Sequence, residues 1–168
     1  MIILGIDPGT NRIGYGLIDH NSQKTRVLDY GCVDLKSDRN NPLSHLPLIQ
    51  KEIVALLKKY QPEVVAVEKL FFFKNKKTVI GVSQARGVIV SSALNQGCKV
   101  KEFTPLEVKQ AVSGYGRADK KAVQKMVRLV LSLDRDPQPD DAADALAVAI
   151  CCAHTVSWEA SSVGYQSN

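Results

Sequence analysis

Four acidic side chains stand at positions where a charge needs an explanation. Asp7 follows a short apolar run over residues 2–6, and Glu68 follows an uninterrupted apolar run over residues 64–67. Such runs, bounded by turn residues, are typical of buried strands. If the two strands are parallel neighbours, both carboxylates emerge at one edge of the sheet, where open α/β sheets place their sites.

Two further acids, Asp141 and Asp144, are three residues apart, a spacing that a helix brings onto one face. Asp140 and Asp141 open this helix, where acids cap the first turn and meet the positive end of the helix dipole. Asp144 lies one turn further and precedes an almost wholly apolar stretch, so its charge needs a cation or hydrogen-bond donors. We expect Asp140 to serve only as a cap.

Together, Asp7, Glu68, Asp141 and Asp144 predict a site for a hard metal ion, catalytic as well as metal-binding. Oxygen ligands without His or Cys suit Mg²⁺, for which Mn²⁺ can substitute. Two such ions about 3.5 to 4 Å apart can activate a water and stabilise a departing oxygen in phosphodiester hydrolysis. The alternative is that the four acids are structural caps.

The overall charge fits a polyanionic partner. The chain has 168 residues with 22 Lys and Arg against 17 Asp and Glu, a net charge of +5. With the four acids set aside, 13 acidic residues remain against 22 basic ones, so the rest of the protein is distinctly basic. A hydrophobic content of 45% and a charged content of 23% exclude disordered, collagen-like and coiled-coil classes.

The sequence shows no motif for other common catalytic or metal sites and no targeting signal. The four cysteines have no C-x-x-C spacing, and the three histidines lie far apart, so neither a zinc site nor a Ser-His-Asp triad is indicated. We expect Cys151 and Cys152 to be reduced core residues. The first apolar run is too short for a signal peptide, and the longest apolar run has nine residues. We therefore expect a cytoplasmic protein that does not bind membranes.

The elements that must position these acids follow from periodicity and turn signals. The pattern predicts three strands in an antiparallel meander, then helix, strand, helix, strand and further helices, which is an α/β domain with a mixed sheet. The expected strands cover residues 2–6, 13–18, 26–35, 64–67 and 100–103. Two long helices are expected over residues 46–60 and 76–95. A short helix begins at Pro105 after the cap Thr104, and another runs from the cap Asp119 through residue 131. The last helix runs from Asp140 to about residue 158. Residues 1–158 form one domain, followed by a frayed tail over residues 159–168.

Four motifs, in order along nearly the whole chain, make the sequence similar to the RuvC-type Holliday junction resolvases. They are Gly5-Ile6-Asp7-Pro8-Gly9-Thr10 with Gly14 and Gly16, Val65-Ala66-Val67-Glu68 with Phe71, Gln84-Ala85-Arg86-Gly87, and Asp141-Ala142-Ala143-Asp144-Ala145-Leu146-Ala147. The first motif alone also opens actin-like ATPases and sugar kinases.

The resemblance implies an RNase H-like fold, a five-stranded mixed sheet with helices on both faces. It implies a homodimer that nicks two strands of like polarity in a four-way DNA junction, in recombination and repair, leaving 5′-phosphate and 3′-hydroxyl ends. It also implies contact with the branch-migration complex RuvA-RuvB. The family's metal ligands fall on Asp7, Glu68, Asp141 and Asp144.

Candidate DNA contacts come partly from the resemblance. Phe71 matches an aromatic that family members use near the crossover, and Lys109 and Lys120 match basic positions near the active site. From the residues themselves, three rings from Phe71 onward are followed by positive charges, a combination that grips unstacked bases, although Phe72 and Phe73 are equally suited to a core. The full set of expected DNA-binding residues is Phe71, Lys74, Lys76, Lys77, Arg86, Lys109, Lys120 and Lys121.

The helix over residues 76–95 carries apolar residues on two faces, one with Val79 and Ile89 and another with Ile80 and Leu94. Such a helix needs two covers, the sheet and either a second subunit or another helix of the same chain. Two other functions remain open. One is an actin-like ATP-binding protein, which would need a second domain, and the other is a non-catalytic junction-binding module.

Overall fold

A five-stranded mixed sheet organises the protein in the computed structural model, which describes residues 1–21, 24–35, 43–69 and 76–164, with the backbone alone at 76–78 and 158–164. The strand order is β3-β2-β1-β4-β5. The strands are β1 (Ile2–Asp7), β2 (Arg12–His20), β3 (Thr25–Asp34), β4 (Val64–Glu68) and β5 (Lys99–Phe103). Strand β2 runs antiparallel to both of its neighbours, β1 and β3, while β4 runs parallel to both β1 and β5. The predicted meander and mixed sheet are confirmed.

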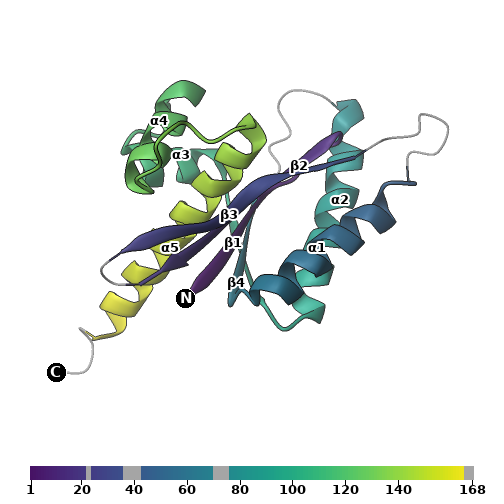
Figure 1. The fold of residues 1–168 in the computed structure, drawn as a ribbon, viewed down its shortest axis with the longest axis horizontal. Helices are drawn as coiled ribbons and strands as arrows, with labels where there is room; N and C mark the ends of the chain where they lie inside the picture. Colours follow the sequence, from purple (N-terminus) through teal and green to yellow (C-terminus); the bar gives the residue numbers. More distant parts are fainter. Residues whose placement is uncertain (22–23, 36–42, 70–75, 165–168) are drawn as a thin grey trace.

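Helices cover both faces of this sheet (Figure 1). One face carries α1 (Leu46–Tyr60) and α2 (Lys76–Asn95), which enclose a core with the central strands. The other face carries α3 (Pro105–Ser113), α4 (Lys120–Val130) and α5 (Asp140–Gly164), which enclose a second core. The predicted architecture, with helices on both faces, is confirmed.

The long helix α5 lies directly on β1 and β2 because small residues line both sides of the contact. A Cβ on Gly14 would come within 2.0 Å of the Asp141 carbonyl oxygen, and a Cβ on Gly5 within 2.2 Å of the Ala145 carbonyl oxygen. No other residue fits at such a distance from a backbone. These two glycines therefore set where the helix lies, and with it the positions of Asp141 and Asp144.

Local signals fix where α3 and α4 begin. Thr104 caps α3 through a capping box, in which its hydroxyl accepts from the Glu107 amide and the Glu107 side chain accepts from the Thr104 amide. Asp119 caps α4 by accepting from the Ala122 amide at 2.8 Å. Both predicted caps are confirmed, and they orient the helices that carry Lys109 and Lys120.

The last helix differs from the expectation at both ends. Asp140 is its first residue rather than a cap before it, and its carboxylate pairs with Lys120 instead of a backbone amide. The helix continues to Gly164, beyond the expected end near residue 158, because Ala, Ser and Val continue a segment with no breaking residue before Gly164. Residues 165–168 lie outside the described part of the chain, and the frayed tail expected over residues 159–168 stays a prediction.

Cys151 and Cys152 lie where the sequence predicts them, inside the protein. Cys98, Cys151 and Cys152 are buried, and none of the four cysteines forms a disulfide bond. Among the described residues, no helix has the length and apolar character needed to cross a membrane.

Candidate active site

Asp7 and Glu68 end neighbouring parallel strands, as the sequence predicts. In the register between β1 and β4, Ile6 pairs with Val67, so the next residue on each strand is a carboxylate at the same edge of the sheet. The segments before them are buried, which fixes both strand ends against the two cores. The sheet therefore brings these two acids together.

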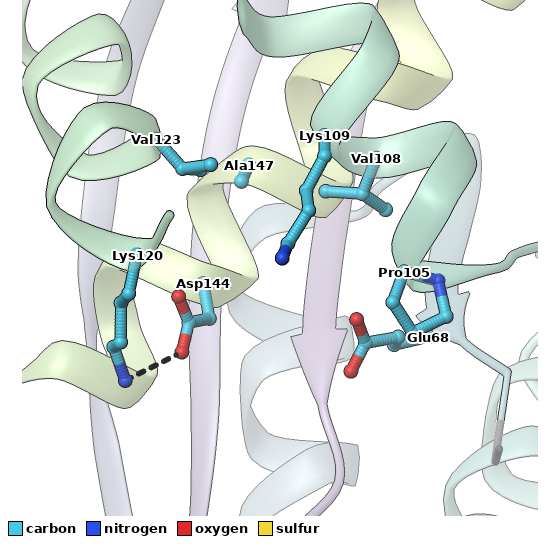
Figure 2. A pocket seen from close by; sticks show the side chains of 8 residues that line it. All are labelled: Glu68, Pro105, Val108, Lys109, Lys120, Val123, Asp144 and Ala147. Carbon is cyan, nitrogen blue, oxygen red and sulfur yellow. Dashed lines mark ion pairs between the residues drawn. The ribbon is translucent and has the colours of Figure 1, made fainter. Parts of the chain in front are cut away.

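A pocket of about 230 Å³ opens beside this edge, between the sheet and the helices α3, α4 and α5. Glu68 and Asp144 face it, and Lys109 and Lys120 point into it from α3 and α4 (Figure 2). Its apolar lining comes from Pro105, Val108, Val123 and Ala147. The pocket thus combines two carboxylates and two ammonium groups on an apolar wall.

Asp144 is held by a lysine from another helix. Lys120 Nζ lies 3.0 Å from Asp144 Oδ2 and 3.4 Å from Asp140 Oδ2, and half of the Lys120 side chain remains exposed, at 50%. The sequence predicts a cation near Asp144 and basic residues near the site. It does not predict that one of these lysines neutralises Asp144 directly.

Asp141 faces a second hollow, of about 360 Å³, lined also by Gly9 to Arg12. Arg12 bridges two acids there, with its Nε 2.8 Å from Asp34 Oδ1 and its Nη1 3.5 Å from Asp141 Oδ2. Sequence reasoning missed Arg12, because a basic residue at the start of a strand carries no signal of which acids the fold will place beside it.

The acids at this edge resist ionisation. Burial, followed by the charges of Glu68, Asp144 and Asp141, raises the pKa of Asp7 from its ordinary 3.8 to about 8. Burial and the charge of Asp144 raise the pKa of Glu68 to about 6, although a hydrogen bond with Asp7 and the charge of Lys109 act in the opposite direction. Burial also raises the pKa of Asp144, against the effect of Lys120.

These electrostatics fit a divalent cation. A partly buried carboxyl whose neighbours are three further acids is the environment that a metal ion compensates. In the described residues, however, no group of three or more His, Cys, Asp or Glu side chains stands close enough to hold a metal ion as it is. Lys120 and Arg12 pair with Asp144 and Asp141 instead, so these two carboxylates would have to leave their ion pairs before they could bind a metal ion.

The other expected DNA contacts fall in different environments. Lys109 lines the pocket, and Lys121 is exposed in the first turn of α4. Arg86 pairs with Glu102 of β5, an ion pair that accounts for its position without DNA. Phe71 and Lys74 lie outside the described residues, as do the side chains of Lys76 and Lys77. The roles of all these residues stay predictions.

The fold and the site together define an RNase H-like domain with acids at the carboxyl ends of its central parallel strands. The sequence profile described as crossover junction endodeoxyribonuclease RuvC matches residues 3–152. The crossover junction endodeoxyribonuclease RuvC of Moorella thermoacetica is 51% identical over 158 residues, covering 94% of each chain. This chain therefore belongs to the RuvC family of crossover junction endodeoxyribonucleases, a family of DNA-hydrolysing enzymes.

Two solved structures are similar to it along nearly their whole length. Thermus thermophilus RuvC is 32% identical, with a TM-score of 0.85 over 95% of this chain and 97% of that one. T. thermophilus RuvC in complex with Holliday junction substrate is 34% identical, with a TM-score of 0.85 over 93% of this chain and 94% of that one. The RNase H-like fold expected from the sequence is confirmed.

Proposed function

We propose that this chain resolves four-way (Holliday) DNA junctions by paired, symmetric, metal-dependent hydrolysis of two strands of like polarity. The observation that carries the proposal is the pocket in which Glu68 and Asp144 face Lys109 and Lys120, beside the perturbed carboxyl of Asp7. Perturbed acids in a concave site are candidates for catalysis. Membership of the RuvC family and the likeness to a RuvC bound to Holliday junction substrate support four-way DNA as the substrate.

The four acids are the proposed metal ligands and catalytic residues. Asp7, Glu68, Asp141 and Asp144 would hold Mg²⁺, with Mn²⁺ as a substitute, and two ions bound there would supply an activated water and stabilise the leaving oxygen. All four side chains offer only oxygen, which suits these cations. Carboxylates released from Lys120 and Arg12 become available for this role.

The lysines of the pocket are the proposed phosphate contacts. Lys109 enters the pocket from α3 and Lys120 from α4, and the carboxylates of Glu68 and Asp144 line the same pocket (Figure 2). An ammonium group binds a phosphate oxygen as a point charge, and the apolar wall lowers the screening of that contact. Water then adds to phosphorus, and the bond to the 3′ oxygen breaks, which leaves a 5′-phosphate and a 3′-hydroxyl.

Cleavage of a synthetic four-way junction tests this function. We expect wild-type protein with Mg²⁺ to nick two strands symmetrically, to leave a linear duplex of the same sequence largely intact, and to lose nicking in EDTA. Glu68→Gln should bind the junction without nicking it, whereas the exposed acid Asp134, replaced in Asp134→Asn, serves as a matched control that retains nicking.

Two results would support the alternatives. Junction binding without cleavage by wild-type protein would indicate a non-catalytic junction-binding module. Thermal stabilisation by ATP, without junction binding, would indicate an actin-like ATP-binding protein. Equal cleavage of junction and linear duplex would contradict the proposed structure selectivity.

Paired cleavage requires two sites, and α2 offers a surface for a second subunit. Ile80 and Leu94 are 67% and 57% exposed, while Ile89 and Ala93 on another side of the helix are buried against the core. Gly87 lies midway between the two exposed residues in sequence, and a Cβ there would meet no atom within 4 Å. Residues seven apart share a side of a helix, so these positions form one exposed apolar stripe.

We therefore propose a homodimer in which the stripes of two α2 helices cover each other. Ile80→Glu combined with Leu94→Glu should convert a dimer into a monomer in sedimentation equilibrium, while Leu129→Glu, at a 55% exposed position on α4, should leave the dimer intact. A monomeric wild-type protein would contradict this proposal. Contact with the branch-migration complex RuvA-RuvB is a further proposal that rests on family membership alone.

A further inference from the structure

The turn between α3 and α4 is fixed by its own hydrogen bonds. Gly114 ends α3 in the left-handed conformation, with φ 72°, and its amide donates to the Gln110 carbonyl oxygen at 2.9 Å. The Gln110 side chain donates to the Gly114 carbonyl oxygen at 2.9 Å and accepts from the Gly116 amide at 2.9 Å. The amide of Ala118 donates to the Tyr115 carbonyl oxygen at 3.0 Å. This network holds Tyr115 at the tip of a compact turn.

Tyr115 presents its ring to solvent rather than to a core. Its side chain is 61% exposed, and so is that of Leu106 in the first turn of α3. The turn that carries Tyr115 packs close to Leu106, since a Cβ on Gly116 would lie 3.2 Å from Leu106 Cγ. A single exposed apolar side chain is ordinary, whereas two large ones near the same turn indicate a binding surface.

The turn also joins the two walls of the site pocket. Lys109 lines that pocket from α3, before the turn, and Lys120 lines it from α4, after the turn. Figure 2 shows both lysines entering the pocket from these two helices. Tyr115 therefore lies six residues after one of the proposed phosphate contacts and five residues before the other.

The charges of this surface are unevenly matched. Its cations include Arg117 and Lys121, both exposed, besides Lys109 of the pocket, whereas Lys120 is paired with Asp140 and Asp144. Its acids are already occupied, because Glu107 accepts from the Thr104 amide at 2.6 Å and Asp119 accepts from the Ala122 amide at 2.8 Å. Each of these carboxylates is hydrogen-bonded at the N-terminus of a helix, which it caps. What remains is an aromatic ring among cations, the composition of a surface that packs on nucleic acid.

We propose that Tyr115 is a DNA contact, whose ring packs on a nucleoside of the junction next to the phosphates held by Lys109 and Lys120. The proposal rests on the proposed function and adds to it a contact made by ring surface rather than charge. A ring of this kind tolerates any sequence, because every base and every sugar offers an apolar face. The hydrogen bonds of the turn already order its backbone in the free protein, so less conformational entropy is lost when DNA binds.

Equilibrium binding of a labelled four-way junction in EDTA tests the contact without cleavage. Tyr115→Ser should weaken junction binding by roughly tenfold, whereas Tyr115→Phe should bind as wild type does. Because no charge is lost, the dependence of affinity on salt should not change in Tyr115→Ser. Arg117→Gln should instead reduce the salt slope by about 0.9. Leu129→Ser, at an exposed apolar position further along α4, is the matched control and should bind normally.

The outcomes separate this inference from the proposed function. Wild-type affinity in Tyr115→Ser, or equal losses in Tyr115→Ser and Leu129→Ser, would overturn the contact and leave the surface to a protein partner. Failure of the wild-type protein to nick the junction with Mg²⁺ would overturn the proposed function alone, provided that it binds the junction and Tyr115→Ser binds it less. Failure of wild-type protein to bind the junction would overturn both. The melting temperature of Tyr115→Ser should match that of wild type, as expected for an exposed side chain.

Discussion

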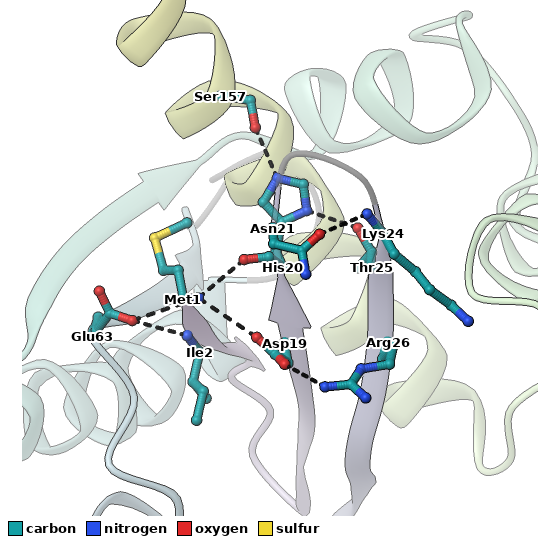
Figure 3. Close-up of polar contacts among 10 residues, drawn as sticks. All are labelled: Met1, Ile2, Asp19, His20, Asn21, Lys24, Thr25, Arg26, Glu63 and Ser157. Carbon is teal, nitrogen blue, oxygen red and sulfur yellow. Dashed lines mark hydrogen bonds and ion pairs between the residues drawn. The ribbon is translucent and has the colours of Figure 1, made fainter.

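The two ends of β1 differ in how their charged groups are paired. At the amino end, the Met1 ammonium donates to the His20 carbonyl oxygen at 3.0 Å and lies 3.5 Å from Asp19 and 3.7 Å from Glu63 (Figure 3). Asp19 in turn lies 2.8 Å from Arg26. At the carboxyl end, Asp7 lies among other acids, and the cations near it pair with Asp144 and Asp141 instead.

The same side chain therefore acquires opposite properties on adjacent strands. A hydrogen bond from Arg26 holds the pKa of Asp19 below its usual value, while burial and neighbouring carboxylates raise the pKa of Asp7 to about 8. Charges at the amino end are satisfied within the chain and serve stability. Charges at the carboxyl end are left in need of a cation from outside, which is what a metal-dependent site requires.

The largest expected effect is on nicking. Asp7→Asn should lower single-turnover nicking by at least about a hundredfold to a thousandfold while junction binding is kept, because a proposed ligand is lost and a polyanion is no less attracted. The same loss is expected for Glu68→Gln, Asp141→Asn and Asp144→Asn. Asp19→Asn, the matched change at the other end of the sheet, should nick normally. Near-normal nicking by any of the four variants would remove that residue from the ligand set.

Stability should respond to pH in opposite directions at the two ends. The folded pKa of Asp7 lies above its unfolded value of 3.8, so its contribution is favourable at low pH and is lost as pH rises towards about 8. The pKa of Asp19 is lowered on folding, so its contribution is present above pH 3.8 and is lost as pH falls below that value. Metal-free protein should therefore lose stability from pH 5 to pH 8.

Thermal melts of Asp7→Asn in EDTA check this linkage. At pH 8 the variant should melt roughly 5 to 10 °C above wild type, because neutralising a carboxyl with such a raised pKa relieves a few kcal/mol. At pH 5 the difference should be small. Asp144→Asn should gain less, since it also loses the ion pair with Lys120. A wild-type protein as stable at pH 8 as at pH 5 would contradict the raised pKa of Asp7.

Metal should stabilise one end of the sheet and leave the other unaffected. Free Mg²⁺ at a hundred times its Kd stabilises a protein by about 2.7 kcal/mol, which raises the melting temperature of a domain of this size by roughly 5 to 10 °C. We expect this rise in wild type and in Asp19→Asn, and little rise in Glu68→Gln. An equal rise in all three would indicate that Mg²⁺ binds elsewhere.

The sequence predicts well the strands and helices that position these charges, for physical reasons. Buried strands and helices each impose a period over many residues, so β4 and α2 were predicted nearly to their ends. The placement of Asp7 beside Glu68 follows from two apolar runs and the geometry of parallel strands. The end of α5 was predicted wrongly, because Ala and Ser continue a helix without an apolar face to mark it.

The ion pairs could not be predicted, because they depend on distances that no local pattern encodes. Arg12 and Asp141 are 129 residues apart, and they meet only because Gly14 lets α5 approach β2. Lys120 was expected near the active site, yet its pairing with Asp144 depends on the angle between α4 and α5. The acids were predicted as a ready metal site, whereas the fold pairs two of them with cations.

Phosphate contacts should also differ between the two ends. Lys109→Ala, in the pocket, should weaken junction binding across sequences and reduce its salt slope by about 0.9, the contribution of one neutralised phosphate. Lys120→Ala should do the same and also destabilise the metal-free protein, since it leaves Asp144 unpaired. Lys24→Ala, an exposed lysine at the opposite end, should change neither. Unchanged salt slopes in both pocket variants would remove these lysines from the DNA surface.

The smallest expected effect compares two arginines in similar ion pairs. Arg26 lies 2.8 Å from Asp19, and Arg12 lies 2.8 Å from Asp34 and 3.5 Å from Asp141. Exposed pairs of this kind contribute little to stability, because water and salt screen them. Arg26→Gln and Arg12→Gln should therefore both lower the melting temperature by only a few degrees.

Their effects on metal use should differ. In Arg12→Gln, no guanidinium competes with the metal ion for Asp141. The Mg²⁺ concentration for half-maximal nicking should therefore fall about twofold to fivefold. This is the size of effect expected from one unit charge at about 4 Å in a water-like medium. Arg26→Gln should leave that concentration unchanged, because its partner Asp19 lies at the other end of the sheet. If Arg12→Gln instead needs more Mg²⁺ than wild type, Arg12 orients Asp141 for the metal rather than competing with it. An unchanged requirement would place Asp141 outside the metal site and reduce the proposed ligand set to Asp7, Glu68 and Asp144.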